Sequence, residues 1–539
     1  MASNSLAQAC VPSTFDLAVF GAEVLSLQAS VITNYSVDVP SAYRYTAPSV
    51  TLENATFCNV TVTYTHPGQN DSINAEAWLP IDNWNERFQA VGGGGWIAGR
   101  FFLSYAGMAG ALNDGYATIT TDAGLGGAYL PTPWALLSPG NVDLYKLQNL
   151  GSVSLNDEAI IGKSLVESFY GKPPSYSYWN GCSQGGRQGL MLAQRYPTAY
   201  DGIAAGAPAI YWTGLTFTTS WPEQFMHMLG EYPYNCELDA LTAAAVSKCD
   251  GLDGVTDGII AEVDECMANF DPFDLVSTTI TCAQTNTTMP ISHAAAAVAN
   301  ATWGGIISST GERLWHGLGI GADLTGNSPK SYGQPGIAAT NCTSSGCVPV
   351  TNTLGSVWIQ LFLAKDPDFN ISSMTHEQFD NLFHASKQQY NSMVGTDDPN
   401  LSAFKKAGGK MITFHGLADN VIPTKGTEQY YRKVSKMVDN IEDFYRYFPV
   451  PGLGHCFGGY GAQPTSLFAQ LQAWVEDGTV PENSPISFPD LDGVTQNRII
   501  CPWPQKAQFD SSCGDSTKTS CWMCLKPENH EELFPSEEL

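Results

Sequence analysis

Residues 181–185 read Gly-Cys-Ser-Gln-Gly, and they follow a short apolar segment that predicts a buried strand. A serine on a sharp turn between a strand and a helix is a typical nucleophile of ester hydrolases, and small neighbours give room to its strained backbone. Gly181 and Gly185 supply that room, so Ser183 is the candidate nucleophile. The motif alone is common, and its unusual member is Cys182, directly before the serine.

A serine hydroxyl needs a base that takes its proton and a carboxylate that orients this base. In hydrolases with this motif, the acid and then the histidine follow the serine on loops after later strands. Asp419 follows a strand expected at 410–416, and His455 lies in a glycine-rich loop after the next expected strand. Asp439 and Asp443 remain alternative acids, although they lie in or beside an expected helix.

Four consecutive glycines, residues 92–95, directly follow another expected strand. The tetrahedral intermediate of ester hydrolysis needs two backbone N–H donors, one after the serine and one from such a glycine-rich loop. We expect Gln184 to provide the first donor and Gly95 the second, with Gly94 as the next choice. A flexible turn is the alternative interpretation of the glycine run.

Two cysteines flank the candidate nucleophile and base, because Cys182 precedes Ser183 and Cys456 follows His455. A disulfide holds its two Cα atoms about 5.5 Å apart. A bond between these cysteines would therefore bring Ser183 and His455 together across a long stretch of chain. Two unrelated structural cysteines are the alternative.

Composition narrows the class of protein. Among 539 residues, Asp and Glu outnumber Lys and Arg by 52 to 25, and this net charge of −27 argues against a nucleic-acid partner. No run of about 18 apolar residues predicts a membrane span. Fourteen cysteines and nine N-x-S/T sequons favour a secreted glycoprotein whose signal peptide has been removed over a cytosolic protein. The sequon asparagines are Asn34, Asn54, Asn59, Asn70, Asn286, Asn300, Asn341, Asn370 and Asn400.

Strand and helix patterns alternate in the first 208 residues and again after residue 396, which predicts an α/β fold with a mostly parallel sheet. The section between them, 209–395, lacks this alternation, so we expect residues 1–208 and 396–539 to form one domain with 209–395 inserted as a second. Strands are expected at 58–65, 87–91, 116–121, 175–179, 202–206, 410–416 and 444–450, and helices at 142–170, 187–196 and 426–439.

These motifs together resemble the tannase and feruloyl esterase family of secreted carboxylesterases. The resemblance implies an α/β-hydrolase core with a large inserted lid, Ser183 as nucleophile, His455 as base, Asp419 as acid and a Cys182–Cys456 bridge. It also implies that His415 lines the substrate pocket, although a histidine that ends a core strand is an alternative. The matching segments are GGGGW (92–96), YWNGCSQGGRQGL (178–190), YDGIAAGAPA (200–209), CDGLDGVTDGII (249–260), HGLADNVIP (415–423) and PGLGHC (451–456).

The segment 249–260 carries three aspartates with glycines between them, in a spacing that is not that of an EF-hand. By itself it is either a turn or a metal loop. The family resemblance implies a structural Ca²⁺ held by the carboxylates of Asp250, Asp253 and Asp257 and the carbonyls of Val255 and Ile259. The resemblance also favours Cys249–Cys266, Cys10–Cys58 and Cys501–Cys524, whereas nearness suggests Cys342–Cys347 and Cys513–Cys521, leaving Cys236 with Cys282.

The hypothesis is a secreted serine esterase that hydrolyses feruloyl and related phenolic esters of plant cell-wall polysaccharides. A tannase that cleaves galloyl esters is the alternative, since the family motifs do not separate the two. A non-catalytic, calcium-dependent binding protein on a hydrolase fold is a third interpretation, disfavoured because the complete triad is present. Trp358 and Phe362 are candidates for an aromatic pocket wall in the lid, although helix packing explains them equally well.

Overall fold

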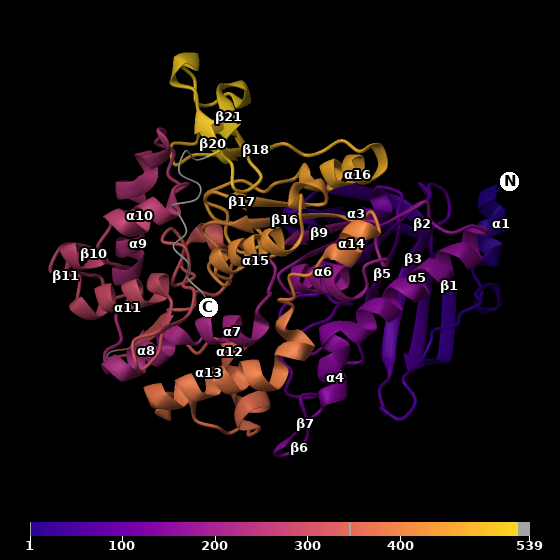
Figure 1. The fold of residues 1–539 in the computed structure, drawn as a ribbon, viewed down its shortest axis with the longest axis horizontal. Coiled ribbons are helices and arrows are strands. Elements are labelled where there is room, and N and C mark those ends of the chain that lie inside the picture. The colour runs from indigo at the N-terminus through magenta and orange to yellow at the C-terminus, as the bar shows by residue number, and fades with distance from the viewer. Residues whose placement is uncertain (1, 344–345, 527–539) are drawn as a thin grey trace.

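The computed structural model describes residues 2–343 and 346–526, and a nine-stranded sheet runs through its centre (Figure 1). The strand order is β1-β2-β3-β5-β4-β8-β9-β16-β17. The six strands from β5 to β17 are parallel, whereas β1, β2 and β3 add an antiparallel edge. The strands are β1 (Glu23–Val39), β2 (Val50–Thr65), β3 (Ile73–Pro80), β4 (Arg87–Val91), β5 (Ala117–Thr121), β8 (Tyr176–Cys182), β9 (Gly202–Gly206), β16 (Lys410–Gly416) and β17 (Tyr445–Val450).

The central strands are short and almost wholly buried, as expected for parallel strands that are covered on both faces. Alternate residues along them enter different hydrophobic clusters: Trp179 and Ile203 join one, and Tyr178 and Ala204 join another. The α/β fold predicted from the alternating segments is therefore confirmed. The main helices against this sheet are α3 (Phe102–Asn113), α5 (Ser154–Tyr170), α6 (Gln184–Arg195), α15 (Thr424–Met437) and α16 (Leu467–Asp477).

Four loops that carry the candidate site leave the carboxyl ends of β4, β8, β16 and β17. Carboxyl ends of parallel strands meet at one edge of the sheet, and ligands of open α/β sheets bind outside that edge. The glycine run, Ser183, Asp419 and His455 thus converge although they are far apart in sequence.

The chain between β9 and β16 adds no strand to the main sheet within its described residues. It folds into helices and short hairpins (Figure 1). Its buried residues form a partly separate hydrophobic core. The predicted limits of the lid, 209 and 395, fall inside this connection. Its helices include α7 (Trp212–Thr218), α8 (Trp221–Leu229), α9 (Asn235–Cys249), α11 (His293–Gly304), α12 (Thr353–Val357) and α13 (His376–Tyr390).

Several elements differ from the expectations. Strands β1 and β3 were not predicted. Strand β1 is a mostly exposed edge strand whose register shifts interrupt its alternation of apolar and polar residues, and β3 is almost wholly buried and so lacks an exposed polar face. The helix expected at 142–170 is interrupted by a π-helical turn at Asn149–Val153. Two C-terminal hairpins, β18 (Ser484–Pro489) with β19 (Thr495–Ile500) and β20 (Lys506–Phe509) with β21 (Trp522–Leu525), were also missed. The end of the expected catalytic domain, 527–539, lies outside the described residues.

All fourteen cysteines are paired, and every pairing named from the sequence is confirmed. Over the described ranges, no helix is long and apolar enough to cross a membrane. The pairs are Cys10–Cys58, Cys182–Cys456, Cys236–Cys282, Cys249–Cys266, Cys342–Cys347, Cys501–Cys524 and Cys513–Cys521.

Candidate active site

Ser183 occupies the turn between β8 and α6 with φ +61° and ψ −118°, a conformation that non-glycine residues rarely adopt. The turn is tight enough that a Cβ on Gly181 would lie 2.7 Å from the backbone of Gly185. Only glycine fits at position 181 without movement of the helix. The strained serine therefore stands out from the sheet edge, as the sequence motif predicted.

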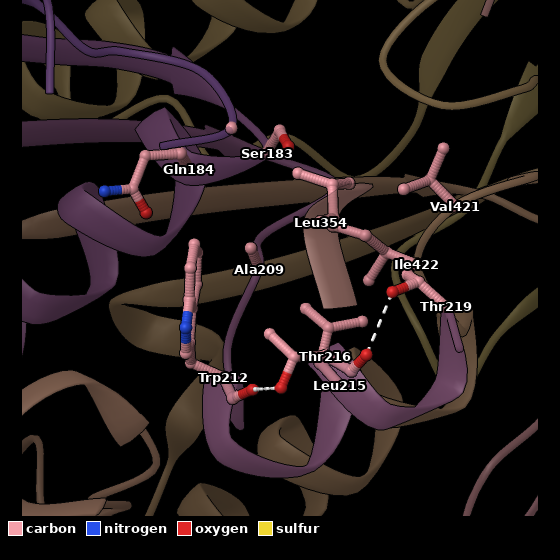
Figure 2. Close-up of a pocket in the computed structure, with 11 residues that line it drawn as sticks. Ser183, Gln184, Ala209, Trp212, Leu215, Thr216, Thr219, Leu354, Val421 and Ile422 are labelled. Carbon is pink, nitrogen blue, oxygen red and sulfur yellow. Dashed lines mark hydrogen bonds between the residues drawn. The ribbon is translucent and has the colours of Figure 1, made fainter. Parts of the chain in front are cut away.

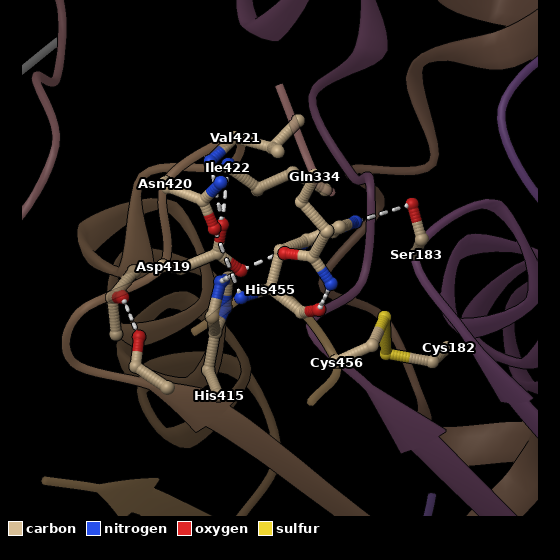
Figure 3. Close-up of polar contacts among 12 residues, drawn as sticks. Cys182, Ser183, Gln334, His415, Asp419, Asn420, Val421, Ile422, His455 and Cys456 are labelled. Atoms are coloured by element: carbon tan, nitrogen blue, oxygen red, sulfur yellow. Dashed lines mark hydrogen bonds and ion pairs between the residues drawn. A yellow bond between two sulfur atoms is a disulfide. The ribbon is translucent and has the colours of Figure 1, made fainter. Parts of the chain in front are cut away.

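The structure brings the three predicted triad residues together (Figure 3). His455 Nε2 lies 2.9 Å from Ser183 Oγ, and His455 Nδ1 lies 2.8 Å from Asp419 Oδ2. Asp419 is buried, and its second oxygen accepts two backbone N–H bonds from the loop that follows it. Burial raises the pKa of the Asp419 carboxyl, but His455 and hydrogen bonds from both neighbouring histidines outweigh this effect and hold the pKa well below its usual value. The acid is therefore ionised and can orient the base.

His415 lies in a different place from the one expected. Its side chain is fully buried and does not line the pocket beside Ser183. Its Nε2 lies 3.1 Å from Asp419 Oδ2, and its Nδ1 lies 2.8 Å from Thr427 Oγ1. A proton on Nε2 satisfies both contacts, so His415 supports the triad acid rather than the substrate.

The bridge between Cys182 and Cys456 joins the loop of the nucleophile to the loop of the base (Figure 3). The two Cα atoms lie 6.0 Å apart, and both cysteines are buried. From the lid, Gln334 Nε2 donates a 2.7 Å hydrogen bond to the His455 carbonyl. The base is thus held by the bridge, by Asp419 and by the lid.

The two expected oxyanion donors flank the serine. Gln184 is the first residue of α6, where a helix leaves N–H groups without helical partners. Gly95 lines the pocket with φ +57°. Gly94 is the weaker choice, because its N–H already donates to the Ile97 carbonyl at 3.0 Å. The arrangement therefore favours Gln184 and Gly95.

The pocket beside Ser183 has mainly apolar walls (Figure 2). Trp212, Leu215 and Leu354 contribute from the inserted segment, and Val421 and Ile422 from the loop after Asp419. Sequence reasoning missed these lid residues, although the Tyr-Trp pair at 211–212 lies only a few residues after the end of β9 and could have signalled them.

The two lid aromatics that were singled out from the sequence lie outside this pocket. Trp358 and Phe362 are fully buried and stack on Trp96 with ring centroids 6.0 and 5.4 Å away. Their alternative interpretation, helix packing, is the one that the structure supports.

Arg187 is a buried residue that sequence reasoning did not select. Its side chain is fully buried, and it donates a 2.6 Å hydrogen bond to the Gln184 side chain and two more to the carbonyls of Leu150 and Gly151. Burial lowers its pKa to about 9. Arg187 therefore fixes the first turn of the helix that carries an oxyanion donor.

The aspartate loop 250–259 lies in the inserted segment. Both Asp250 oxygens accept backbone N–H bonds at 2.9 Å, while Asp253 and Asp257 pair with the guanidinium of Arg498 from β19. Among the described residues, no three acidic, histidine or cysteine side chains are gathered closely enough to form a metal site. Asp257 Oδ1 is nevertheless buried without a partner in the described part of the chain, and burial raises the pKa of Asp257 to about 7. The loop has three carboxylates and only one guanidinium beside it, so its net charge is negative. Its carboxylate oxygens are also suitable ligands for an additional cation.

The chain is similar to several known ester hydrolases. The family model "Tannase and feruloyl esterase" matches residues 58–525. A "Probable feruloyl esterase" of Arthroderma benhamiae is 38% identical over 94% of this chain and 91% of its own length. A tannin acyl hydrolase from Aspergillus niger superimposes with a TM-score of 0.84 at 28% identity, covering 97% of this chain and 95% of that one. Feruloyl esterase B from Aspergillus oryzae shares the fold, with a TM-score of 0.75 at 23% identity over 96% and 100%.

Proposed function

Since the chain belongs to the tannase and feruloyl esterase family, we propose that it is a serine carboxylesterase that hydrolyses feruloyl and related hydroxycinnamate esters. Its substrate is the ester of a phenolic acid attached to plant cell-wall polysaccharide. The apolar pocket beside the assembled triad is the observation that supports a phenolic acid as the acyl part of this ester.

The geometry supports a two-step acyl transfer. Ser183 Oγ attacks the ester carbonyl while His455 Nε2 takes its proton, and Asp419 stabilises the imidazolium through Nδ1. The N–H groups of Gln184 and Gly95 hold the oxyanion. His455 then protonates the departing alcohol, and a water molecule activated by the same base releases the phenolic acid and restores the serine.

The polar atoms of the pocket favour ferulate over gallate. The hydroxyls of Thr216 and Thr219 donate to carbonyls of their own helix at 3.0 and 2.9 Å, as the dashed lines in Figure 2 mark. Trp212 Nε1 is a buried donor without a partner among the described residues. A methoxy oxygen can accept from that N–H. The two threonine oxygens keep their acceptor lone pairs, which suffice for the single phenolic hydroxyl of ferulate but not for the three hydroxyls of gallate. Leaving polar groups unpaired costs about 1–3 kcal/mol each.

We expect kcat/KM for methyl ferulate to exceed that for methyl gallate by about 10–100-fold, the discrimination that a mainly apolar pocket can reach against added hydroxyls. Initial rates on both methyl esters, measured with one enzyme preparation, give this ratio. Faster hydrolysis of the gallate ester would assign the tannase activity instead.

We further propose that Ca²⁺ binds the aspartate loop and has a structural role. The carboxylates of Asp250, Asp253 and Asp257, with the carbonyls of Val255 and Ile259, are the oxygen ligands that Ca²⁺ prefers. The unpartnered Asp257 Oδ1 and the excess of negative charge support this proposal. The ion would neutralise the loop within the lid and takes no part in the chemistry at Ser183.

Chelation should lower the melting temperature, because calcium at 100 times its Kd stabilises the folded state by about 2.7 kcal/mol. Differential scanning calorimetry with EGTA and with added CaCl₂ measures the shift. Asp257→Asn is the matched variant, and its melting temperature should change little on chelation. An equal shift in both proteins, or no bound calcium by elemental analysis of the wild type, would rule the site out.

The protein is, in our proposal, secreted and glycosylated. Its seven disulfides support an oxidising compartment. Eight of the nine sequon asparagines are exposed, whereas Asn59 is half-buried on β2, between β1 and β3, and its Oδ1 is buried. We expect glycans at exposed sequons and none at Asn59. Peptide mass spectrometry of protein secreted by a eukaryotic host, before and after deglycosylation, tests this, and an unmodified protein would contradict it.

A further inference from the structure

We propose that a row of aromatic side chains beside His455 binds the saccharide on the alcohol side of the ester, as a neutral oligosaccharide. This inference rests on the proposed function, because it assigns a binding site to the second half of the same substrate. It is carried by the position of the row beside the loop of the base and by a cavity at the end of the row whose wall mixes apolar and polar side chains.

The row, which we call the aromatic row, consists of Phe101, Phe102, Tyr43, Phe457 and Tyr332. Successive ring centroids lie 5.4, 6.0, 6.2 and 6.4 Å apart. Phe102 and Tyr332 are 54% and 68% exposed. Rings from four separate segments of the chain therefore form one continuous and partly exposed strip.

The loop of the base and the segment after the glycine run each carry part of this row. Phe457 follows the base by two positions, and its N–H donates to the His455 carbonyl at 2.8 Å. The Phe101 ring packs against the glycine run, since a Cβ on Gly94 would lie 3.0 Å from it. Tyr332, from the lid, lies beside the loop of the base, since a Cβ on Gly458 would lie 3.1 Å from its ring. The row thus passes the reacting centre on the side of His455.

This is the side on which the alcohol of the ester must lie. His455 Nε2 gives its proton to the departing alcohol oxygen, so that oxygen lies within hydrogen-bonding reach of Nε2. The pocket for the acid is lined by other residues, including Trp212 and Leu354, and by no member of the aromatic row. Acid and alcohol therefore have separate binding surfaces.

A cavity of about 600 Å³ lies at the end of the row, between the lid loop that carries Tyr332 and the loop of the base. Ser328, Ser331, Gln334 and Tyr460 line it, together with carboxylates and the Asn420 amide. No lysine, arginine or histidine lines it among the described residues.

A surface that combines exposed aromatic faces with hydroxyl, amide and carboxylate groups fits a sugar chain. Aromatic rings pack against the apolar C–H faces of sugars, and the polar groups pair with their hydroxyls. Among the described residues, the side chains that line the cavity include carboxylates and no cation, and the calcium proposed at Asp250 would only neutralise the aspartate loop. An anionic alcohol would therefore meet no net positive charge there. A purely apolar alcohol would leave the spare hydrogen-bonding groups of this wall, such as the unpartnered Gln334 Oε1, unused. The chemistry therefore favours a neutral oligosaccharide.

The experiment compares two ferulic esters, methyl ferulate and a ferulate ester of a neutral pentose oligosaccharide. Phe102→Ala with Tyr332→Ala removes the two most exposed rings of the row. We expect kcat/KM for the oligosaccharide ester to fall about tenfold, in line with the worth of a few ring contacts, and that for methyl ferulate to stay within twofold. Phe20→Ala is the control, because Phe20 is fully exposed just before β1, at the opposite edge of the sheet.

Equal losses on both esters, or no loss on either, would overturn the proposal. If the wild type hydrolyses neither ester, the proposed function fails, and the subsite is then tested by NMR titration with the unesterified pentose oligosaccharide. Weaker binding in the double variant than in Phe20→Ala supports the subsite independently of hydrolysis. Equal binding in the two variants, or none to the wild type, overturns it.

Discussion

Replacing Ser183 with alanine should lower kcat for methyl ferulate about 10⁶-fold, the loss seen when a triad nucleophile is removed. Its Oγ lies 2.9 Å from His455 Nε2 on a strained turn that presents it to the pocket. No other serine, threonine or cysteine side chain among the residues lining this pocket contacts the base. Steady-state rates, with active sites counted by a fluorophosphonate probe, measure the effect.

The triad acts as a unit, so the losses should not add. His455→Ala should cost about as much as Ser183→Ala, and the double variant should be no slower than either single one. Thr219→Ala offers a folded control in the same pocket that leaves the triad intact. Rates for Ser183→Ala equal to those of the wild type would remove Ser183 as the nucleophile and revive the interpretation as a non-catalytic binding protein.

The catalytic residues could be predicted because local chemistry determines them. The strand–turn–helix pattern around Ser183 needs glycines that the sequence shows, and the order of acid and histidine follows from the order of the parallel strands. The paired cysteines added a contact between loops that are far apart in sequence. Each of these signals is short and depends little on how the lid packs.

The pocket walls could not be predicted in the same way. Whether an aromatic residue faces the substrate or the core depends on the path of the inserted segment. That segment has no periodic sequence pattern from which its helices and strands could be predicted. Trp212 therefore lines the pocket, while Trp358, equally aromatic, packs in the core. Likewise, no spacing in the sequence predicts that Arg498, from a late hairpin, pairs with two aspartates of the expected calcium loop.

His415 shows how one pattern supports two roles. It lies four positions before Asp419, and its resemblance to a pocket-lining position of the family placed it at the site from sequence alone. Which way its side chain points depends on the helix α15 that packs over β16 and offers Thr427 as a partner. Such contacts arise between elements and leave no local signature.

Removing the Cys182–Cys456 bridge should affect stability and catalysis together. The bridge closes a separation of 274 residues, against 46 for Cys236–Cys282 in the lid. Loss of a native disulfide typically costs about 2–5 kcal/mol, and the chain-entropy model makes the longer closure worth about 1.5 kcal/mol more. We therefore expect Cys182→Ala with Cys456→Ala to unfold at a lower denaturant concentration than Cys236→Ala with Cys282→Ala.

The effect on catalysis separates a positioning role from a merely structural one. Without the bridge, the loops of Ser183 and His455 lose the covalent link that holds their backbones 6.0 Å apart at the cysteines. Small losses of alignment at reacting groups cost about 100-fold in rate, so kcat of the folded double variant should fall by that order while KM changes less. The lid variant should keep its kcat, measured well below its melting temperature. Equal kcat values in the two variants would show that the bridge only stabilises the fold and has no positioning role. In that case Asp419 and Gln334 would suffice to hold the base in line with the serine.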